Sequence, residues 1–174
     1  MKLFLEIYLW AAENAETVRF FHVQTEITER QKDPDAIMKD QLEQLGMLNG
    51  KGARYAHSTS WRYEDQRILL TYLVWVDGQK LENLPSGRVF ICSVACPESR
   101  GLLSPRPESI CVAHVLVHGL RHLRHLAFDK KDTVAAELLD CQRTRDLLLS
   151  LEPASSGRLS SKSAAVVKSL RLAQ

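Results

Sequence analysis

The chain has 174 residues, of which 45% are hydrophobic and 25% are charged, and its formal net charge at pH 7 is +2. These values suit a globular domain large enough to bury a core, and the charge is too small to indicate a nucleic-acid-binding protein. No apolar run approaches the roughly 20 residues that cross a bilayer. Glu6 interrupts the apolar N-terminal stretch, which resembles a strand more than a signal peptide. We therefore expect a cytoplasmic protein without a membrane segment.

The N-terminal part of the chain predicts two strands followed by a helix. Alternating apolar residues indicate strands at 2–10 and 17–28. Asp33 can cap a helix, and Pro34 fits its first position. Gly46 is suited to the C-terminal end of the same helix.

The middle of the chain predicts three more strands. The first two are expected at 54–63 and 66–76, and the near-continuous apolar run of the second indicates a central strand covered on both faces. The pair Asp77-Gly78 is a hairpin-type turn signal, although the polar residues after it favour a connecting loop. Another strand is expected at 88–95.

The C-terminal part of the chain predicts helices. We expect a loop at 97–107, then a long helical region that breaks around 129–132 and resumes from 133 to about 151. The residues at 152–174 are rich in Ser and Ala and predict a mobile basic tail. Residues 1–151 are therefore predicted to form one domain.

The four cysteines predict no metal or disulfide framework. Cys92, Cys96, Cys111 and Cys141 include no C-x-x-C pair. On a straight strand Cys92 and Cys96 would lie roughly 13 Å apart, too far to share a zinc ion whose bonds to sulfur are about 2.3 Å long. We expect buried, reduced thiols.

Residues 39–47 read Lys-Asp-Gln-Leu-Glu-Gln-Leu-Gly-Met, which resembles the second half of the Nudix box, R-E-U-x-E-E-x-G-U. Lys39 stands at the family's Arg and Asp40 at its first Glu, while Glu43 and Gln44 fall on its paired glutamates. The order of the predicted elements is also similar to that family. The resemblance implies an α/β fold: a Nudix-like α/β/α sandwich with a mixed sheet, a box-type helix near 34–45 and C-terminal helices.

The hydrolase chemistry that the resemblance implies depends on negatively charged side chains on the helix. In the Nudix family, helix carboxylates hold Mg²⁺ against a diphosphate, and the metal activates water. A functional box would therefore imply Mg as cofactor and a nucleotide-like small molecule as partner. Thr25 and Gln31 stand where the family has its upstream Gly and Glu, and Gln44 brings no charge. The same spacing is also typical of an ordinary solvated helix face.

Two functions follow from the resemblance. We interpret the chain as a Nudix-like protein that lacks efficient hydrolase activity and acts in ligand binding, regulation or scaffolding. The alternative is a divergent Mg-dependent hydrolase of nucleoside diphosphate derivatives that relies on Asp40 and Glu43. The apolar strand at 66–76 is compatible with a homodimer without requiring one.

A row of histidines on the predicted C-terminal helix suggests a further alternative, a His-rich metal- or anion-binding protein. Spacings of 4, 4 and 3 residues place the four histidines within an arc of about 80° on a helix, opposite its apolar face. This arc is also typical of an exposed polar surface, and the spacing supplies no third convergent ligand. The candidate metal ligands on this helix are His114, His118 and His122, and the candidate anion- or partner-binding residues are Arg121, Arg124 and His125.

Overall fold

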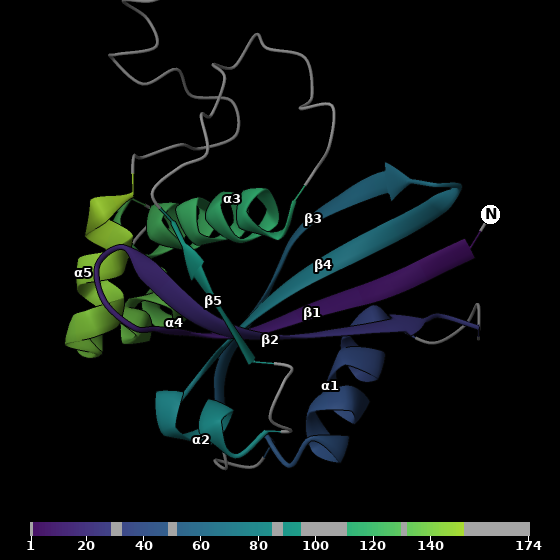
Figure 1. The fold of residues 1–174 in the computed structure, drawn as a ribbon, viewed down its shortest axis with the longest axis horizontal. Coiled ribbons are helices and arrows are strands. Elements are labelled where there is room, and N and C mark those ends of the chain that lie inside the picture. The colour runs from purple at the N-terminus through teal and green to yellow at the C-terminus, as the bar shows by residue number, and fades with distance from the viewer. Residues whose placement is uncertain are drawn as a thin grey trace, which may run out of the picture.

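The computed structural model describes residues 2–28, 33–48, 52–84, 89–94, 111–129 and 132–151. Within them, one mixed sheet has the strand order β3-β4-β1-β2-β5, shown in Figure 1. The central strands β1 and β4 are parallel, and the other neighbouring pairs are antiparallel. The strands are β1 (Lys2–Ala12), β2 (Thr17–Glu26), β3 (Ala53–Glu64), β4 (Arg67–Val76) and β5 (Val89–Ser93).

Helices cover both faces of this sheet. Helices α1 and α2 lie on one face, and α3, α4 and α5 lie on the other (Figure 1). A π-helical turn and a 3₁₀ turn extend α3 and α4. The elements are α1 (Pro34–Gln44), α2 (Gly78–Glu82), α3 (Val112–Arg124), the π turn (His125–Asp129), α4 (Thr133–Ala136), the 3₁₀ turn (Glu137–Asp140) and α5 (Gln142–Ser150). The predicted α/β class and mixed sheet are confirmed at this level, whereas the finer Nudix-like assignment stays a prediction.

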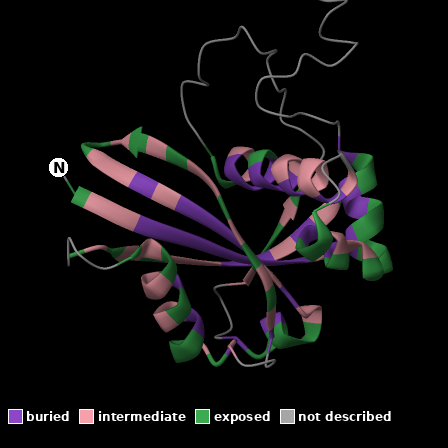
Figure 2. Cartoon of the chain, turned by 180° about the vertical axis from the view of Figure 1, so that it is seen from behind, coloured by how far each residue is buried: buried purple, intermediate pink, exposed green. Residues whose placement is uncertain are grey.

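The central strand β1 is buried on both faces because its side chains alternate between two apolar clusters. Leu5, Ile7 and Leu9 pack with residues of α1 and α2, whereas Tyr8 and Trp10 pack with residues of α3 and α5. Figure 2 shows the buried residues concentrated in the central strands and on the helix sides next to the sheet. The core therefore consists of two layers separated by the sheet.

Helix α1 begins where the sequence predicts. The Asp33 side chain accepts a hydrogen bond from the backbone N–H of Asp35 at 3.1 Å, and Pro34 occupies the first helical position. Met38 and Leu42 are the buried residues of the helix, so they fix its apolar side against the sheet. The capping pair and the apolar spacing together explain why this segment is helical.

The segment after β4 differs from the prediction. Residues 78–82 form the short helix α2 instead of a connecting loop. The Asp77 side chain accepts a hydrogen bond from the N–H of Gln79 at 3.0 Å and caps this helix. Leu81 is fully buried, and burial of this side chain against the sheet stabilises a helix whose sequence is otherwise polar.

The remaining elements agree with the prediction to different extents. The strands lie within about two residues of their expected bounds. The described part of the C-terminal helical region begins at Val112. The π turn ends at Asp129, and α4 begins at Thr133 after its capping residue Asp132, so the helical region is interrupted and resumes where the sequence predicts. The predicted loop at 97–107 and the tail at 152–174 lie outside the described residues.

Two further expectations can be compared with the described residues. Three cysteines there are free thiols, and Cys111 is exposed instead of buried, whereas Cys92 and Cys141 are half-buried. Cys96 lies outside the described residues. No helix in the described ranges combines the length and apolar character needed to cross a membrane.

Candidate functional site

A cavity of about 580 Å³ lies where the parallel strands β1 and β4 end. Ligands of open α/β sheets commonly bind at the carboxyl ends of the strands. Helices α2 and α5 start beside this cavity on opposite sides of the sheet (Figure 1). Its lining comes from the ends of β1 and β4 (Ala11, Ala12, Glu13, Trp75, Val76, Asp77), from α2 (Gly78, Gln79, Glu82), from β2 and β3 (Arg19, Arg54), and from the start of α5 (Asp140, Cys141, Gln142, Arg143, Thr144).

Thr144 is the most unusual residue of this lining. It is fully buried, and its Oγ1 atom has no hydrogen-bond partner within the described residues. Leaving a buried polar atom unpaired costs about 1–3 kcal/mol, so such atoms are rare unless something else satisfies them. Among the described residues that carry a buried unpaired side-chain nitrogen or oxygen, Thr144 alone lines the cavity.

The start of α5 adds backbone donors to the same wall. Cys141 precedes the helix and makes no capping hydrogen bond through its side chain. The first N–H groups of a helix have no partner inside the helix and give this end a partial positive charge. The wall that contains Thr144 is therefore rich in donors.

The opposite wall holds a charged group that is already paired. Arg19 lies 2.7 Å from the carboxylate of Glu13 and 2.6 Å from that of Glu82. The hydrogen bond that Arg19 donates to Glu82 and the charges of both carboxylates raise the pKa of Arg19, against a smaller opposing effect of burial. This triad links β2 and α2 to the residue that follows β1, so it fixes the shape of the wall.

The remaining charges of the lining carry both signs. Arg54 and Arg143 make no ion pair with another described residue, and both are exposed. Asp77 caps α2, and Asp140 is an exposed carboxylate at the end of the 3₁₀ turn. A ligand of this cavity would therefore meet two unpaired arginines, Arg143 in α5 and Arg54 on β3, and mainly carboxylates beside α2.

A second polar cluster surrounds Glu6 on the α3 side of the sheet. The carboxylate is almost fully buried and accepts hydrogen bonds from Arg62 at 2.6 and 2.9 Å. Tyr8 donates to it at 2.9 Å and Thr71 at 3.2 Å, and the His22 ring nitrogen lies 3.2 Å away. The only sequence signal for this cluster is a glutamate inside an apolar strand.

The electrostatics of Glu6 indicate a structural role. Burial alone would raise the pKa of Glu6, but hydrogen bonds from His22, Arg62 and Tyr8 and the charge of Arg62 outweigh it and lower the pKa to about 2. Burial and the neighbouring Glu6 carboxylate raise the pKa of Tyr8. A carboxylate with this many donors is a poor proton acceptor, so we do not assign it a catalytic role.

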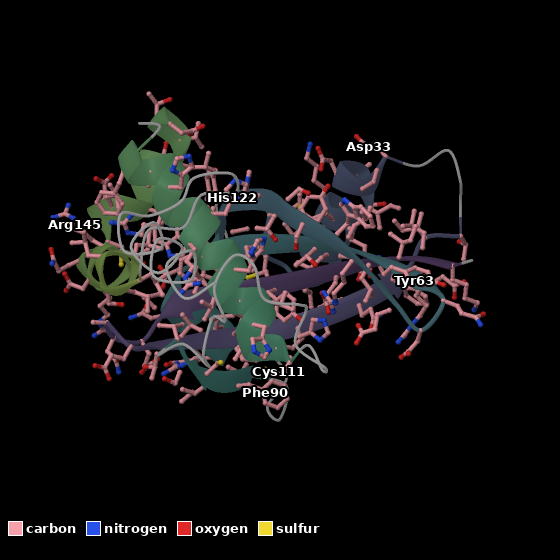
Figure 3. All side chains as sticks on the ribbon, turned by 90° about the horizontal axis from the view of Figure 1, so that it is seen from above. Asp33, Tyr63, Phe90, Cys111, His122 and Arg145 are labelled. Carbon is pink, nitrogen blue, oxygen red and sulfur yellow. The ribbon has the colours of Figure 1, made fainter. Side chains whose placement is uncertain are left out.

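The predicted histidine face is only partly exposed. His118 is exposed, whereas His114, His122 and His125 are half-buried. Figure 3 shows Cys111 at the start of α3 and His122 further along it. The Nδ1 atom of His122 lies 3.3 Å from the Nε2 atom of His57 on β3, so this helix face packs partly against the sheet.

The two predicted arginines on α3 also pack partly against the rest of the protein. Arg121 and Arg124 are half-buried, and the guanidinium of Arg124 lies 5.6 Å from the ring centre of Phe128. In the described part of the chain, no three His, Cys, Asp or Glu side chains are placed to hold a metal ion. The histidines therefore do not form a three-ligand site with one another.

The box-type residues lie on α1, away from the cavity lining. Lys39, Glu43 and Gln44 are exposed, and Asp40 is half-buried. The structure thus supports the helix predicted for the box, and it places the cavity elsewhere. Sequence reasoning missed the cavity residues because Thr144 and the arginines carry no motif.

Comparison with protein-family models, with curated proteins and with solved structures finds no match to this chain. The Nudix resemblance therefore rests on residues 39–47 and the order of the elements alone.

Proposed function

We propose that this protein binds a small polar molecule in the cavity at the carboxyl ends of β1 and β4. The observation that carries the proposal is the cavity itself, about 580 Å³ in volume, because small-molecule sites are typically concavities of about 300–1,000 Å³. Its mixed charges and unpaired donors favour a polar ligand. The proposal keeps the ligand-binding function suggested by the sequence and locates it away from the box-type helix.

The geometry also supports a preformed site. The triad of Arg19 with Glu13 and Glu82 fixes one wall, and the floor consists of the ends of two central strands. A rigid site loses less conformational freedom when a ligand binds. We therefore expect binding without a large rearrangement of the sheet.

A screen of polar metabolites by thermal shift tests the proposal. Compounds that bind the cavity raise the melting temperature of the native protein by mass action. The variant Gln79→Trp places a bulky ring in the lining and should abolish these shifts. The matched variant Gln24→Trp, at an exposed position on β2, should leave them unchanged. The proposal fails if no compound shifts the melting temperature, or if the active compounds shift Gln79→Trp equally.

A further inference from the structure

The wall of the cavity formed by α5 has the chemistry of an anion site. We infer that the ligand carries a compact oxyanion, a phosphate or carboxylate group, bound at the N-terminal end of α5 by the Thr144 hydroxyl and the first backbone N–H groups of the helix. This inference rests on the proposed function and adds the chemical class of the ligand.

The backbone of α5 provides the first argument. The helix has nine residues, and its first internal bond runs from the N–H of Arg145 to the carbonyl of Cys141 at 2.9 Å. The N–H groups of residues 142–144 precede that bond and make no hydrogen bond to another described residue. The N-terminal N–H groups of a helix bind anions because they point outward and carry partial positive charge.

Thr144 provides an independent argument. Its hydroxyl is fully buried yet unpaired, and it lies in the first turn of α5 and in the cavity wall. A threonine hydroxyl donates one hydrogen bond, and an oxyanion placed against the first turn would accept it together with the backbone N–H groups. A bound oxyanion would thus satisfy the one unpaired buried side-chain oxygen that the described lining contains.

The unpaired arginines of the lining provide the third argument. Arg143 lies in the first turn and Arg54 reaches the same cavity from β3, and neither is paired with a described carboxylate. Asp140 precedes α5 and opposes an anion there. Of the other lining carboxylates, Asp77 caps α2 and Glu13 and Glu82 pair with Arg19. Arg19 cannot contribute in the same way, because Glu13 and Glu82 already occupy it.

A titration followed by NMR tests the inference directly. Inorganic phosphate and acetate are added separately to the full chain, and the backbone amide resonances are monitored. We expect the largest shifts at residues 142–144. The two probes distinguish the sources of the oxyanion, since the stronger binder identifies phosphate or carboxylate as the preferred group. Shifts confined to other regions would overturn the inference.

Thr144 variants separate binding from folding. Thr144→Val keeps the shape and removes the hydroxyl, so we expect at least tenfold weaker binding of the preferred anion with an unchanged or higher melting temperature. Thr144→Ser should retain most of the affinity, and Thr133→Val, outside the cavity on α4, should retain all of it. Equal affinity in Thr144→Val, or a lower melting temperature, would show that the hydroxyl serves another purpose and would overturn the inference.

The thermal-shift screen distinguishes a failure of the proposed ligand site from a failure of the oxyanion inference. The informative compounds are those that raise the melting temperature of the native protein but not that of Gln79→Trp. If all of these compounds lack an acidic group, the cavity is a ligand site and the oxyanion inference alone is wrong. If no compound shifts the melting temperature and neither anion perturbs residues 142–144, both fail. Acidic compounds that bind the native protein and lose affinity in Thr144→Val support both.

Discussion

Arg62 on the edge strand β3 donates two hydrogen bonds to the buried carboxylate of Glu6 on the central strand β1, at 2.6 and 2.9 Å. The side chains reach each other across β4, on which Thr71 donates a third hydrogen bond to the same carboxylate. The pair is bidentate and nearly withdrawn from water, with 16% of the Arg62 side chain and 4% of the Glu6 side chain exposed. The buried carboxylate of Glu6 therefore links β1, β3 and β4 through its hydrogen bonds to Arg62 and Thr71.

Removal of Arg62 should be strongly destabilising. Arg62→Met leaves the Glu6 carboxylate buried without its cation, and we expect a loss of about 3–5 kcal/mol in the free energy of unfolding. Urea denaturation followed by tryptophan fluorescence measures the loss. The control Arg67→Met breaks an exposed pair with Asp65 and should cost below about 1 kcal/mol. A loss below about 1 kcal/mol for Arg62→Met as well would contradict the structural role of the pair.

The same carboxylate should make the protein sensitive to acid. The pKa of Glu6 falls from 4.5 to about 2 on folding, so the unfolded state binds the proton more readily. The stabilisation is present above about pH 4.5 and is lost as the pH falls toward about 2, a change of about 3 kcal/mol. Urea denaturation between pH 6 and 2.5 measures it. Glu6→Gln should show a smaller decrease over this range, and a decrease equal to that of the native protein would refute the assignment.

The contact between His57 and His122 should add a pH dependence nearer neutrality. Burial and then the adjacent His122 lower the pKa of His57, against an opposite effect of Asp132. Burial and the nearby His118 and His125 lower the pKa of His122. Because the folded state then binds fewer protons than the unfolded state, stability should decrease as the pH falls below about 6.5. The double variant His57→Gln, His122→Gln should lose less stability between pH 7.5 and 5, measured by thermal unfolding; an identical decrease would argue against this contact.

Gly119 is expected to be required for the packing of α3 on the sheet. A Cβ atom at this position would lie 2.4 Å from Cδ1 of Leu73, which is fully buried on β4. Gly119→Ala should therefore cost about 1–3 kcal/mol through overpacking, as measured by chemical denaturation. The control Gly78→Ala places its Cβ at an ordinary 3.7 Å from Ala11 and should have little effect. Equal stability of the two variants would show that α3 lies farther from the sheet.

The hydrolase alternative gives the fifth prediction. A turnover screen of nucleoside diphosphate derivatives with Mg²⁺ or Mn²⁺ should show only background activity, because Gln44 brings no charge to the box-type helix and Asp40 and Glu43 lie away from the cavity lining. The double variant Asp40→Ala, Glu43→Ala should match the native protein. Robust turnover that disappears in this variant would instead establish the box-type helix as the active site.

Elements whose signals are local can be predicted from the amino-acid sequence. Asp33 and Pro34 specify the start of α1, and Gly46 follows the helix with a φ of 68°, a conformation that glycine adopts without strain. The apolar run at 66–76 indicated a strand covered on both faces, and β4 lies in the interior of the sheet. Capping, backbone freedom and periodicity act over a few residues, so they can be read from the chain alone.

Features that depend on residues far apart in the sequence become visible only in the folded chain. Helix α2 forms where the local sequence favoured a loop, because Leu81 is buried in the core. Glu6 and Arg62 are 56 residues apart, and nothing local pairs them. The cavity likewise combines the ends of β1 and β4 with the starts of α2 and α5, and the burial that leaves the Thr144 hydroxyl unpaired exists only once those segments have packed together.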